Sequence, residues 1–148
     1  MELDKKDKKI LNILQDKGRI PYHELADKLE MSQSAVYERV KKLQESGVIK
    51  KITPFLDKKE IGDYRTALVR IKTKTGNIEE IAKKLTKIEN IQEVYSTSGR
   101  YDILIKIVAK DMESLNEFIT KKLSKFEIRE TTYFVIMKTY KEDPKIKL

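Results

Sequence analysis

The sequence has no cysteine and only one histidine, His23. Disulfide bonds, thiolate zinc sites and cysteine nucleophiles are therefore excluded. A single imidazole cannot build a histidine metal site either, because such sites need several nitrogen ligands. Paired carboxylates, a phosphate-cradling glycine loop and a nucleophile beside a base are also not recognisable. We therefore expect no catalytic residues, no metal and no cofactor.

Long apolar runs are also missing. A helix that spans a bilayer needs about 20 apolar residues, and no stretch of the sequence approaches that length. The N-terminal stretch MELDKKDKKI mixes both signs of charge and lacks the apolar segment of a signal peptide. We therefore expect a cytoplasmic protein with no membrane partner.

The charge is strongly unbalanced towards cations. The formal net charge is +8 and the isoelectric point is about 9.4, which favours a polyanionic partner such as double-stranded DNA. The excess is not concentrated at the N-terminus, because residues 1–55 hold twelve basic and nine acidic side chains. Charged residues make up 38% of the chain, and this composition is typical of an archaeal or thermophilic source.

Residues 32–47, SQSAVYERVKKLQESG, have the pattern of a helix with both ends marked. Ser32 is a good N-cap, and Gly47 suits the left-handed residue after a helix. Ala35, Val36, Val40 and Leu43 fall on one face, which we expect to be buried. The other face carries groups that reach base edges and phosphates, although it also fits an ordinary solvated helix. The candidate DNA contacts are Ser32, Gln33, Ser34, Tyr37, Arg39, Lys41 and Lys42.

Two shorter helices precede this one. Asp4 or Asp7 can cap a first helix that ends at Gly18, and Pro21 suits the first turn of a second helix. About three residues then lead into the helix after Ser32, as a helix-turn-helix requires. The sequence therefore predicts a three-helix DNA-binding domain over residues 1–50.

The rest of the chain changes to a strand-rich pattern. Residues 51–63 are a linker or short edge strand, and residues 64–148 form a second domain. The predicted elements are a strand at 64–75, a helix with a capping box between Asn77 and Glu80, strands at 91–99 and 101–109, a helix capped by Asp111, and a strand at 129–141. This βαββαβ order is ferredoxin-like, with two helices on one face of an antiparallel sheet. The predicted fold class is α+β.

Both faces of that predicted sheet carry apolar side chains. Ile103, Ile105 and Ile107 alternate with Leu104 and Val108. In the last strand, Phe134 and Ile136 alternate with Tyr133, Val135 and Met137. A sheet with helices on one side would leave the second apolar face exposed, so we predict that two chains pack back to back. A homodimer also presents two recognition helices to half-sites about one helical turn apart.

The stretches LDKKDKKILNILQDKGRI and HELADKLEMSQSAVYERVKKLQESGVIKK resemble the DNA-binding domain of the Lrp/AsnC family of transcription regulators, the feast/famine regulators. STSGRYDILIKI and RETTYFVIMKTYK resemble the family's effector-binding and oligomerisation domain. The chain departs from the family at Glu30, where the turn usually has glycine, and at Pro21, where a serine-like cap is usual. The resemblance implies a DNA-binding regulator whose dimers assemble further, into a tetramer or an octamer.

The same resemblance implies that an amino acid or related small metabolite binds near the Gly-x-Tyr-Asp turn. The candidate effector residues are Gly99, Arg100, Tyr101, Asp102 and Thr132. Gly99 allows close backbone approach, and the Asp102 carboxylate can accept hydrogen bonds from a ligand ammonium group. Alternatively, Asp102 only pins the hairpin.

Two other functions fit parts of the sequence. A low-specificity architectural protein could compact DNA through linked dimers. A tetrapyrrole decarboxylase can resemble this family in fold, but residues 64–148 contain no histidine for tetrapyrrole chemistry. A specific regulator that needs two recognition helices makes a further prediction: a chain cut after Pro54 binds DNA poorly even if it folds.

Overall fold

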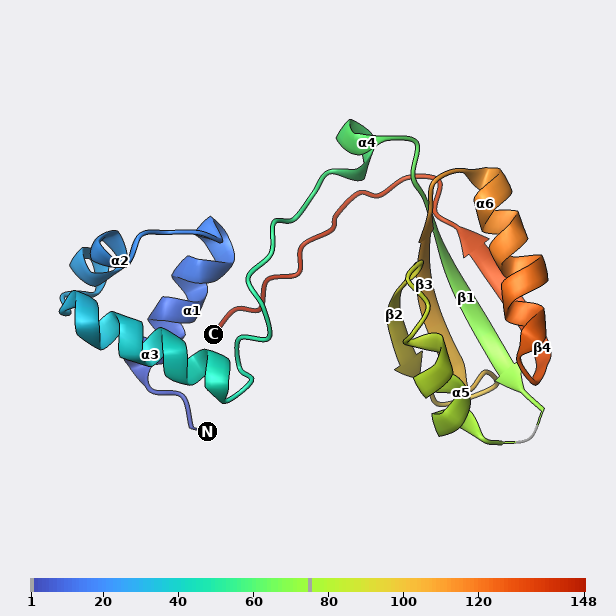
Figure 1. Cartoon of the computed structure of the whole chain (residues 1–148), viewed down its shortest axis with the longest axis horizontal. Helices are drawn as coiled ribbons and strands as arrows, with labels where there is room; N and C mark the ends of the chain where they lie inside the picture. The colour runs from blue at the N-terminus through green and yellow to red at the C-terminus, as the bar shows by residue number, and fades with distance from the viewer. Residues whose placement is uncertain (1, 75) are drawn as a thin grey trace. The chain divides into compact units, whose positions relative to one another are not determined.

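The computed structural model describes residues 2–74 and 76–148. Met1 and Thr75, which the predicted first domain and first strand included, lie outside these residues. The chain forms two compact units (Figure 1). The first unit holds the residues up to Phe55 together with Lys141–Leu148, and the second holds Leu56–Tyr140. In the described part of the chain, no helix is long and apolar enough to cross a membrane.

Three helices build the first unit: α1 (Lys5–Lys17), α2 (Tyr22–Leu29) and α3 (Gln33–Glu45). Their apolar faces close one core, and three of the members predicted on the third helix are buried in it. The fourth, Ala35, is only partly buried, because it lies in the first turn beside the N-cap. The fully buried side chains include Ile10, Leu25, Val36, Val40 and Leu43. Burial of such aliphatic side chains contributes about 1.5–3 kcal/mol each, so the core holds the three helices together.

The predicted ends of α1 and α3 are confirmed. Asp4 is the N-cap of α1 and forms a capping box with Asp7, and Gly18 at φ 59° ends the helix. Ser32 caps α3 by accepting a hydrogen bond from the Ala35 amide. Gly47 follows the helix at φ 75°, in the left-handed region. These residues fix where the two longest helices of the unit begin and end.

Helix α2 starts and ends differently from what we predicted or what the family usually shows. Pro21 is the N-cap itself and not a first-turn residue, and it offers no side-chain hydrogen bond. Glu30 ends the helix in the left-handed conformation, at φ 51° and ψ 51°. A side chain in this conformation costs roughly 1–2 kcal/mol relative to the right-handed one. Glu30 therefore adopts the backbone conformation that the turn requires, at a cost in conformational energy.

Replacing Glu30 with glycine should raise the free energy of unfolding by about 0.5–1 kcal/mol. Glycine removes the left-handed penalty, and its larger unfolded-state entropy offsets part of the gain. Chemical denaturation of the full chain measures the change. Glu30→Ala is the control, because alanine keeps the strain. Equal stability of the two variants would contradict this explanation.

We predicted either a linker or a short edge strand after the first domain. Residues 48–56 contain no strand, so this stretch is a linker. A short helix that the sequence did not predict follows, α4 (Lys58–Ile61). Asp57 caps it by accepting a hydrogen bond from the Lys59 amide at 2.9 Å. The charged stretch at the predicted domain boundary is therefore partly helical.

The last eight residues belong to the first unit, although we predicted them as part of the second domain. The Gln15 side chain on α1 accepts a hydrogen bond from the Ile146 amide at 2.7 Å and donates one to the Ile146 carbonyl at 2.9 Å. Lys145 Nζ lies 3.2 Å from Asp16 Oδ1. The terminal segment therefore contacts α1 through hydrogen bonds between the Gln15 side chain and the Ile146 backbone, and through the Lys145–Asp16 ion pair.

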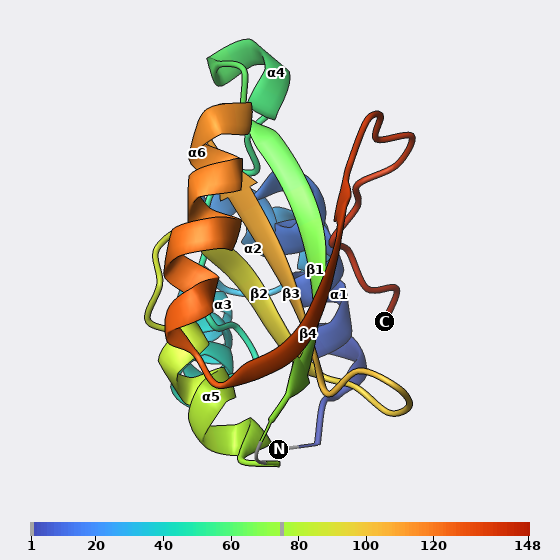
Figure 2. The same ribbon diagram turned by 90° about the vertical axis from the view of Figure 1, so that its right-hand side faces the viewer.

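The second unit has the predicted ferredoxin-like topology. Its strands are β1 (Arg65–Thr73), β2 (Ile91–Ser96), β3 (Ile103–Ala109) and β4 (Ile128–Val135), paired antiparallel in the order β2-β3-β1-β4. Helix α5 (Ile78–Leu85) follows β1, and α6 (Met112–Glu117) follows β3 and continues as helical turns to Lys125. Both helices lie on one side of the sheet (Figures 1 and 2).

The core of this unit lies between the sheet and these helices. It contains Val69 and Ile71 of β1 and the three alternating isoleucines of β3, all with an exposed fraction of 0–1%. Asp111 caps α6 as predicted. The predicted capping box at Asn77 is wrong, because the Asn77 side chain bonds the Glu80 carboxylate and not the helix backbone.

The opposite side of the sheet, which we call the open face, differs from our prediction. Period-two alternation places charged as well as apolar residues there, and the last strand ends at Val135 instead of residue 141. Most apolar members gather towards the start of β1, namely Leu68, Val108, Phe134 and Ile136. Two residues of β3 depart from this, since Leu104 lies opposite Arg70 and Lys106 lies opposite Leu68. The polar members gather near the β2–β3 turn and include Arg70, Lys72, Asp102, Glu130 and Thr132. The open face therefore has an apolar end and a polar end.

Candidate functional site

Helix α3 presents a polar row to solvent. Gln33, Ser34, Tyr37, Lys41 and Lys42 are all exposed, on the side of the helix away from its buried Val36, Val40 and Leu43. Ser32, the N-cap, lies at the start of this row, and its hydroxyl is 3.1 Å from that of Ser34. Amide, hydroxyl and ammonium groups on one helix face can meet base edges and phosphates.

The Tyr37 ring has a defined support. Tyr22 at the start of α2 packs edge-on against it, with ring centroids 5.7 Å apart and ring planes at 88°. Tyr22 is half-buried against the helical core, whereas Tyr37 keeps an exposed fraction of 47%. Edge-to-face pairs of this kind restrict the ring while leaving its hydroxyl accessible. Tyr37 is thus held in an outward orientation.

Arg39 is used differently from the other predicted DNA contacts. Its Nη1 lies 2.6 Å from Asp4 Oδ2 and 2.7 Å from Asp7 Oδ1. The Asp7 amide and the Arg39 guanidinium lower the pKa of Asp4. A guanidinium committed to two carboxylates would have to leave them to bind a phosphate. In the free chain Arg39 therefore fastens α3 against the start of α1, and its contact with the DNA backbone stays a prediction.

The β2–β3 turn carries the second group of predicted residues and extends past the sheet (Figure 2). Gly99 has a φ of 104°, which favours glycine. The Thr97 hydroxyl donates to the Tyr101 carbonyl at 2.8 Å, and the Asp102 amide donates to the Ile71 carbonyl at 2.9 Å. The turn is thereby fixed both internally and to β1.

The Asp102 carboxylate is already occupied by β1. One oxygen lies 2.8 Å from Lys72 Nζ, and the other accepts the Thr73 amide at 2.8 Å and the Thr73 hydroxyl at 2.9 Å. The Lys72 ammonium, followed by the Thr73 amide, lowers the pKa of Asp102 from 3.8 to about 2. This geometry favours the alternative in which Asp102 pins the hairpin, and leaves it little capacity for a ligand ammonium group.

Acid should weaken this attachment. The pKa of Asp102 in the folded chain lies below its unfolded value, so its stabilising effect is complete above about pH 4 and is lost as the pH falls towards 2. We expect Asp102→Asn to lower the melting temperature at neutral pH and the difference from the parent chain to shrink between pH 4 and 2. Thermal melts over this range measure it. Asp27→Asn, at an exposed position on α2, is the control and should show no such convergence.

Tyr101 and Glu130 connect Thr132 and Arg100 in one set of polar contacts. The Tyr101 hydroxyl donates to Glu130 Oε1 at 2.9 Å and lies 2.8 Å from Thr132 Oγ1. Arg100 Nη2 lies 2.9 Å from the same Glu130 oxygen. The Tyr101 hydroxyl and the Arg100 guanidinium lower the pKa of Glu130. The structure therefore brings all the predicted effector residues to one end of the sheet.

Sequence reasoning missed the partners that organise this cluster. Arg70, Lys72 and Thr73 of β1 and Glu130 of β4 all contact it. Arg70 and Lys72 occupy every second position of an otherwise apolar strand, ALVRIKT, and therefore share its open face. Charged residues at every second position of this strand indicate, from the sequence alone, that the open face is not uniformly apolar.

Comparisons with known proteins place both halves of the chain in one family. Residues 3–50 match the model of a winged helix-turn-helix DNA-binding domain, and residues 66–146 match that of the Lrp/AsnC ligand-binding domain. The HTH-type transcriptional regulator FL11 of Pyrococcus horikoshii is 40% identical over 140 residues, which cover 95% of this chain and 93% of that protein. The transcriptional regulator AzlB of Bacillus subtilis is 41% identical over 124 residues, 82% of this chain and 79% of that protein.

A solved structure agrees with these matches. The structure of E. coli AsnC superposes with a TM-score of 0.87 at 25% identity and covers 100% of both chains. The predicted resemblance and the predicted α+β fold are confirmed. On the combined match of both halves, the chain belongs to the Lrp/AsnC family of transcriptional regulators, with a DNA-binding helix-turn-helix and a ligand-binding domain.

Proposed function

We propose that this regulator reads double-stranded DNA through the exposed row on α3. Gln33, Ser34 and Tyr37 contact base edges, and Ser32, Lys41 and Lys42 contact the backbone. The observation that carries the proposal is the coincidence of this polar, solvent-facing row with the third helix of the matched DNA-binding domain. Lys41 lies 4.0 Å from Glu45, a surface pair weak enough for a phosphate to displace.

The active unit in this proposal is a homodimer formed through the apolar end of the open face. Phe134 has an exposed fraction of 47% in the single chain, and Leu68, Val108 and Ile136 are only partly covered. Apolar side chains grouped on an unpaired sheet face favour association. Two copies joined there supply two recognition helices, and contacts between such dimers would build the tetramer or octamer.

The polar end of the same face is the proposed effector site. It holds Arg100, Tyr101 and Thr132 in one hydrogen-bonded cluster, next to Gly99, whose φ of 104° favours glycine. We propose an amino acid or a related small metabolite as the ligand. Such a ligand regulates DNA binding only if it binds one assembly or DNA-bound state more tightly than another.

The proposal assigns no catalytic step to this chain. The two carboxylates of the cluster, Asp102 and Glu130, are held by Lys72 and Arg100. They are therefore poorly placed to exchange protons with a substrate, and the similar proteins are named as transcriptional regulators.

Gel shifts against excess competitor DNA test the main proposal. A specific regulator should prefer its own site by about 10³-fold or more over random DNA at physiological salt. A preference near unity would instead identify a low-specificity architectural protein. Light scattering of the same samples, with and without added amino acids, reports whether a ligand changes the assembly state.

A further inference from the structure

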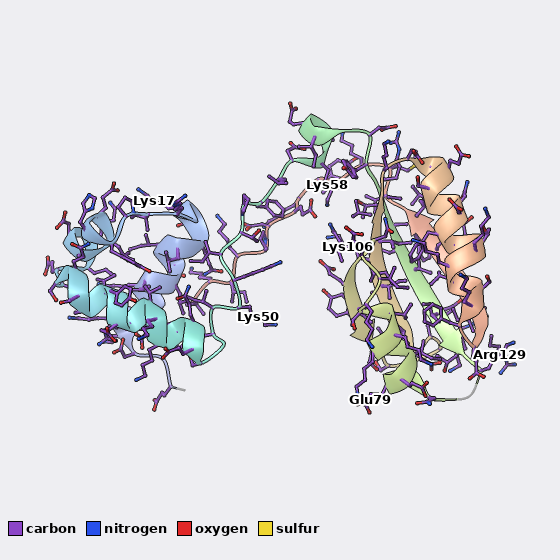
Figure 3. All side chains as sticks on the ribbon, in the orientation of Figure 1. Lys17, Lys50, Lys58, Glu79, Lys106 and Arg129 are labelled. Carbon is purple, nitrogen blue, oxygen red and sulfur yellow. The ribbon has the colours of Figure 1, made fainter. Side chains whose placement is uncertain are left out.

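Arg70 lies at the polar end of the open face and has no ion-pair partner among the described residues. Lys72 is paired with Asp102, Arg100 with Glu130, and Lys106 with Glu93. Lys106 extends from the side of the sheet opposite α6 (Figure 3). Within residues 2–74 and 76–148, no hydrogen bond or ion pair to the Arg70 guanidinium is found, and its Nε is buried without a partner. No carboxylate of these residues neutralises the guanidinium, which leaves it available to an anionic ligand or partner group.

The Arg70 guanidinium is also held in place. Its central carbon lies 4.7 Å from the ring centroid of Tyr101 and 4.7 Å from that of Phe134. Two aromatic faces favour the cation and limit its rotation, and leave the edge of the guanidinium for hydrogen bonds. Tyr101 is itself fixed by its bonds to Glu130 and Thr132. The donor edge is therefore positioned before any ligand arrives.

A cavity of about 380 Å³ adjoins this guanidinium. Its lining comes from β1, β3 and the β2–β3 turn: Arg70, Thr97, Ser98, Arg100, Tyr101 and Leu104. The volume lies within the range of small-molecule sites. Two guanidinium groups and no carboxylate contribute to the lining. Arg100 is paired with Glu130, but this pair is solvent-exposed and a ligand carboxylate can displace it, so the cavity favours an anion over a cation.

We infer that this cavity binds a small dicarboxylate, with one carboxylate on Arg70 and the second towards Arg100. The inference rests on the proposed effector site and narrows its ligand to acidic amino acids or 2-oxo dicarboxylic acids. A carboxylate matches the planar donor edge of arginine in a two-bonded geometry. A neutral or basic ligand would bring only one carboxylate, or an added cation, to a lining that already holds two cations.

Calorimetric titration of the full chain at physiological salt tests the inference. The probes are L-glutamate and 2-oxoglutarate, compared with L-glutamine and L-lysine. We expect at least one dicarboxylate to bind about tenfold or more tightly than glutamine and lysine. The two dicarboxylates distinguish an amino-acid source from an oxo-acid source.

Arg70→Gln should weaken that dicarboxylate about tenfold or more, because a charge-assisted pair is lost. Arg70→Lys keeps the charge without the planar fork and should recover only part of the affinity. Arg129→Gln is the matched control, since Arg129 lies at the start of β4 and outside the cavity lining (Figure 3). Circular dichroism establishes that each variant is folded.

Several results would overturn the inference. One is equal or tighter binding of glutamine or lysine, and another is unchanged affinity in Arg70→Gln. If Arg70→Gln dissociates the ligand-free dimer and leaves ligand affinity intact, a second copy supplies the partner of Arg70 instead. Gel shifts separate the first two results from failure of the proposed function, because a chain that stays dimeric should still bind DNA. A dissociated Arg70→Gln variant should bind DNA weakly, and analytical ultracentrifugation identifies it.

Discussion

Leu68→Asp should convert the protein to a monomer and weaken operator binding by about a hundredfold or more. Leu68 lies on β1 between Lys106 of β3 and Phe134 of β4, at the apolar end of the open face. A carboxylate there is solvated in the single chain but would be buried in the proposed dimer, where a charge is strongly unfavourable. The neighbouring Lys106 is already paired with Glu93. A monomer also loses the gain of about 10²–10⁴ that comes from joining two binding modules.

Analytical ultracentrifugation and gel shifts measure the two effects on one sample. Met112→Asp is the matched control, because it places the same charge at an exposed position at the start of α6. It should leave both assembly and DNA affinity unchanged. A chain that ends after Pro54 provides a second monomeric form and should also bind DNA poorly. Undiminished DNA affinity in monomeric Leu68→Asp would refute the requirement for two recognition helices.

Gln33→Ala and Lys42→Ala should weaken DNA binding in two distinguishable ways. A side chain that reads a base edge contributes about 1–3 kcal/mol of discrimination, so Gln33→Ala should lose about 10- to 100-fold on the operator and little on random DNA. Lys42→Ala should weaken both DNAs similarly and reduce the slope of log affinity against log salt by about one. Fluorescence anisotropy over a salt series measures both quantities.

The two variants control for each other, because both positions are exposed on α3 and neither side chain packs in the core. Arg39→Ala is the informative contrast. Its guanidinium is committed to Asp4 and Asp7, so its loss should lower the melting temperature. An unchanged salt slope for Lys42→Ala, or an equal loss on both DNAs for Gln33→Ala, would contradict the assigned roles.

Local chemistry explains why much of the fold was predictable. Ser32 and Asp111 cap helices because a short oxygen-bearing side chain can bond a free amide in the first turn, and no other part of the chain is needed for that. The alternation of Ile103, Ile105 and Ile107 likewise fixes which side of β3 is buried. Patterns that depend on neighbours in sequence were read correctly at these positions.

Long-range partners explain what the sequence did not show. Arg39 looks like a phosphate contact on its own helix, and its pairing with Asp4 and Asp7 depends on the crossing of α1 and α3. Nothing in the last eight residues indicates that Ile146 bonds Gln15, because the two are separated by 131 positions. Ion pairs and backbone hydrogen bonds between distant segments carry no periodic signal.

The sequence by itself determined the family, the two-part α+β organisation and the polar row on α3, because helix caps, periodicity and motif spacing are local properties. Only the tertiary structure decided which charged side chains near the Gly99 turn are free to bind a ligand. Folding brings Lys72 and Thr73 to Asp102, which occupies that carboxylate. It also places the Arg70 guanidinium between Tyr101 and Phe134, with no carboxylate of the described residues paired to it. Whether a charged side chain is available for binding depends on which groups the fold places beside it.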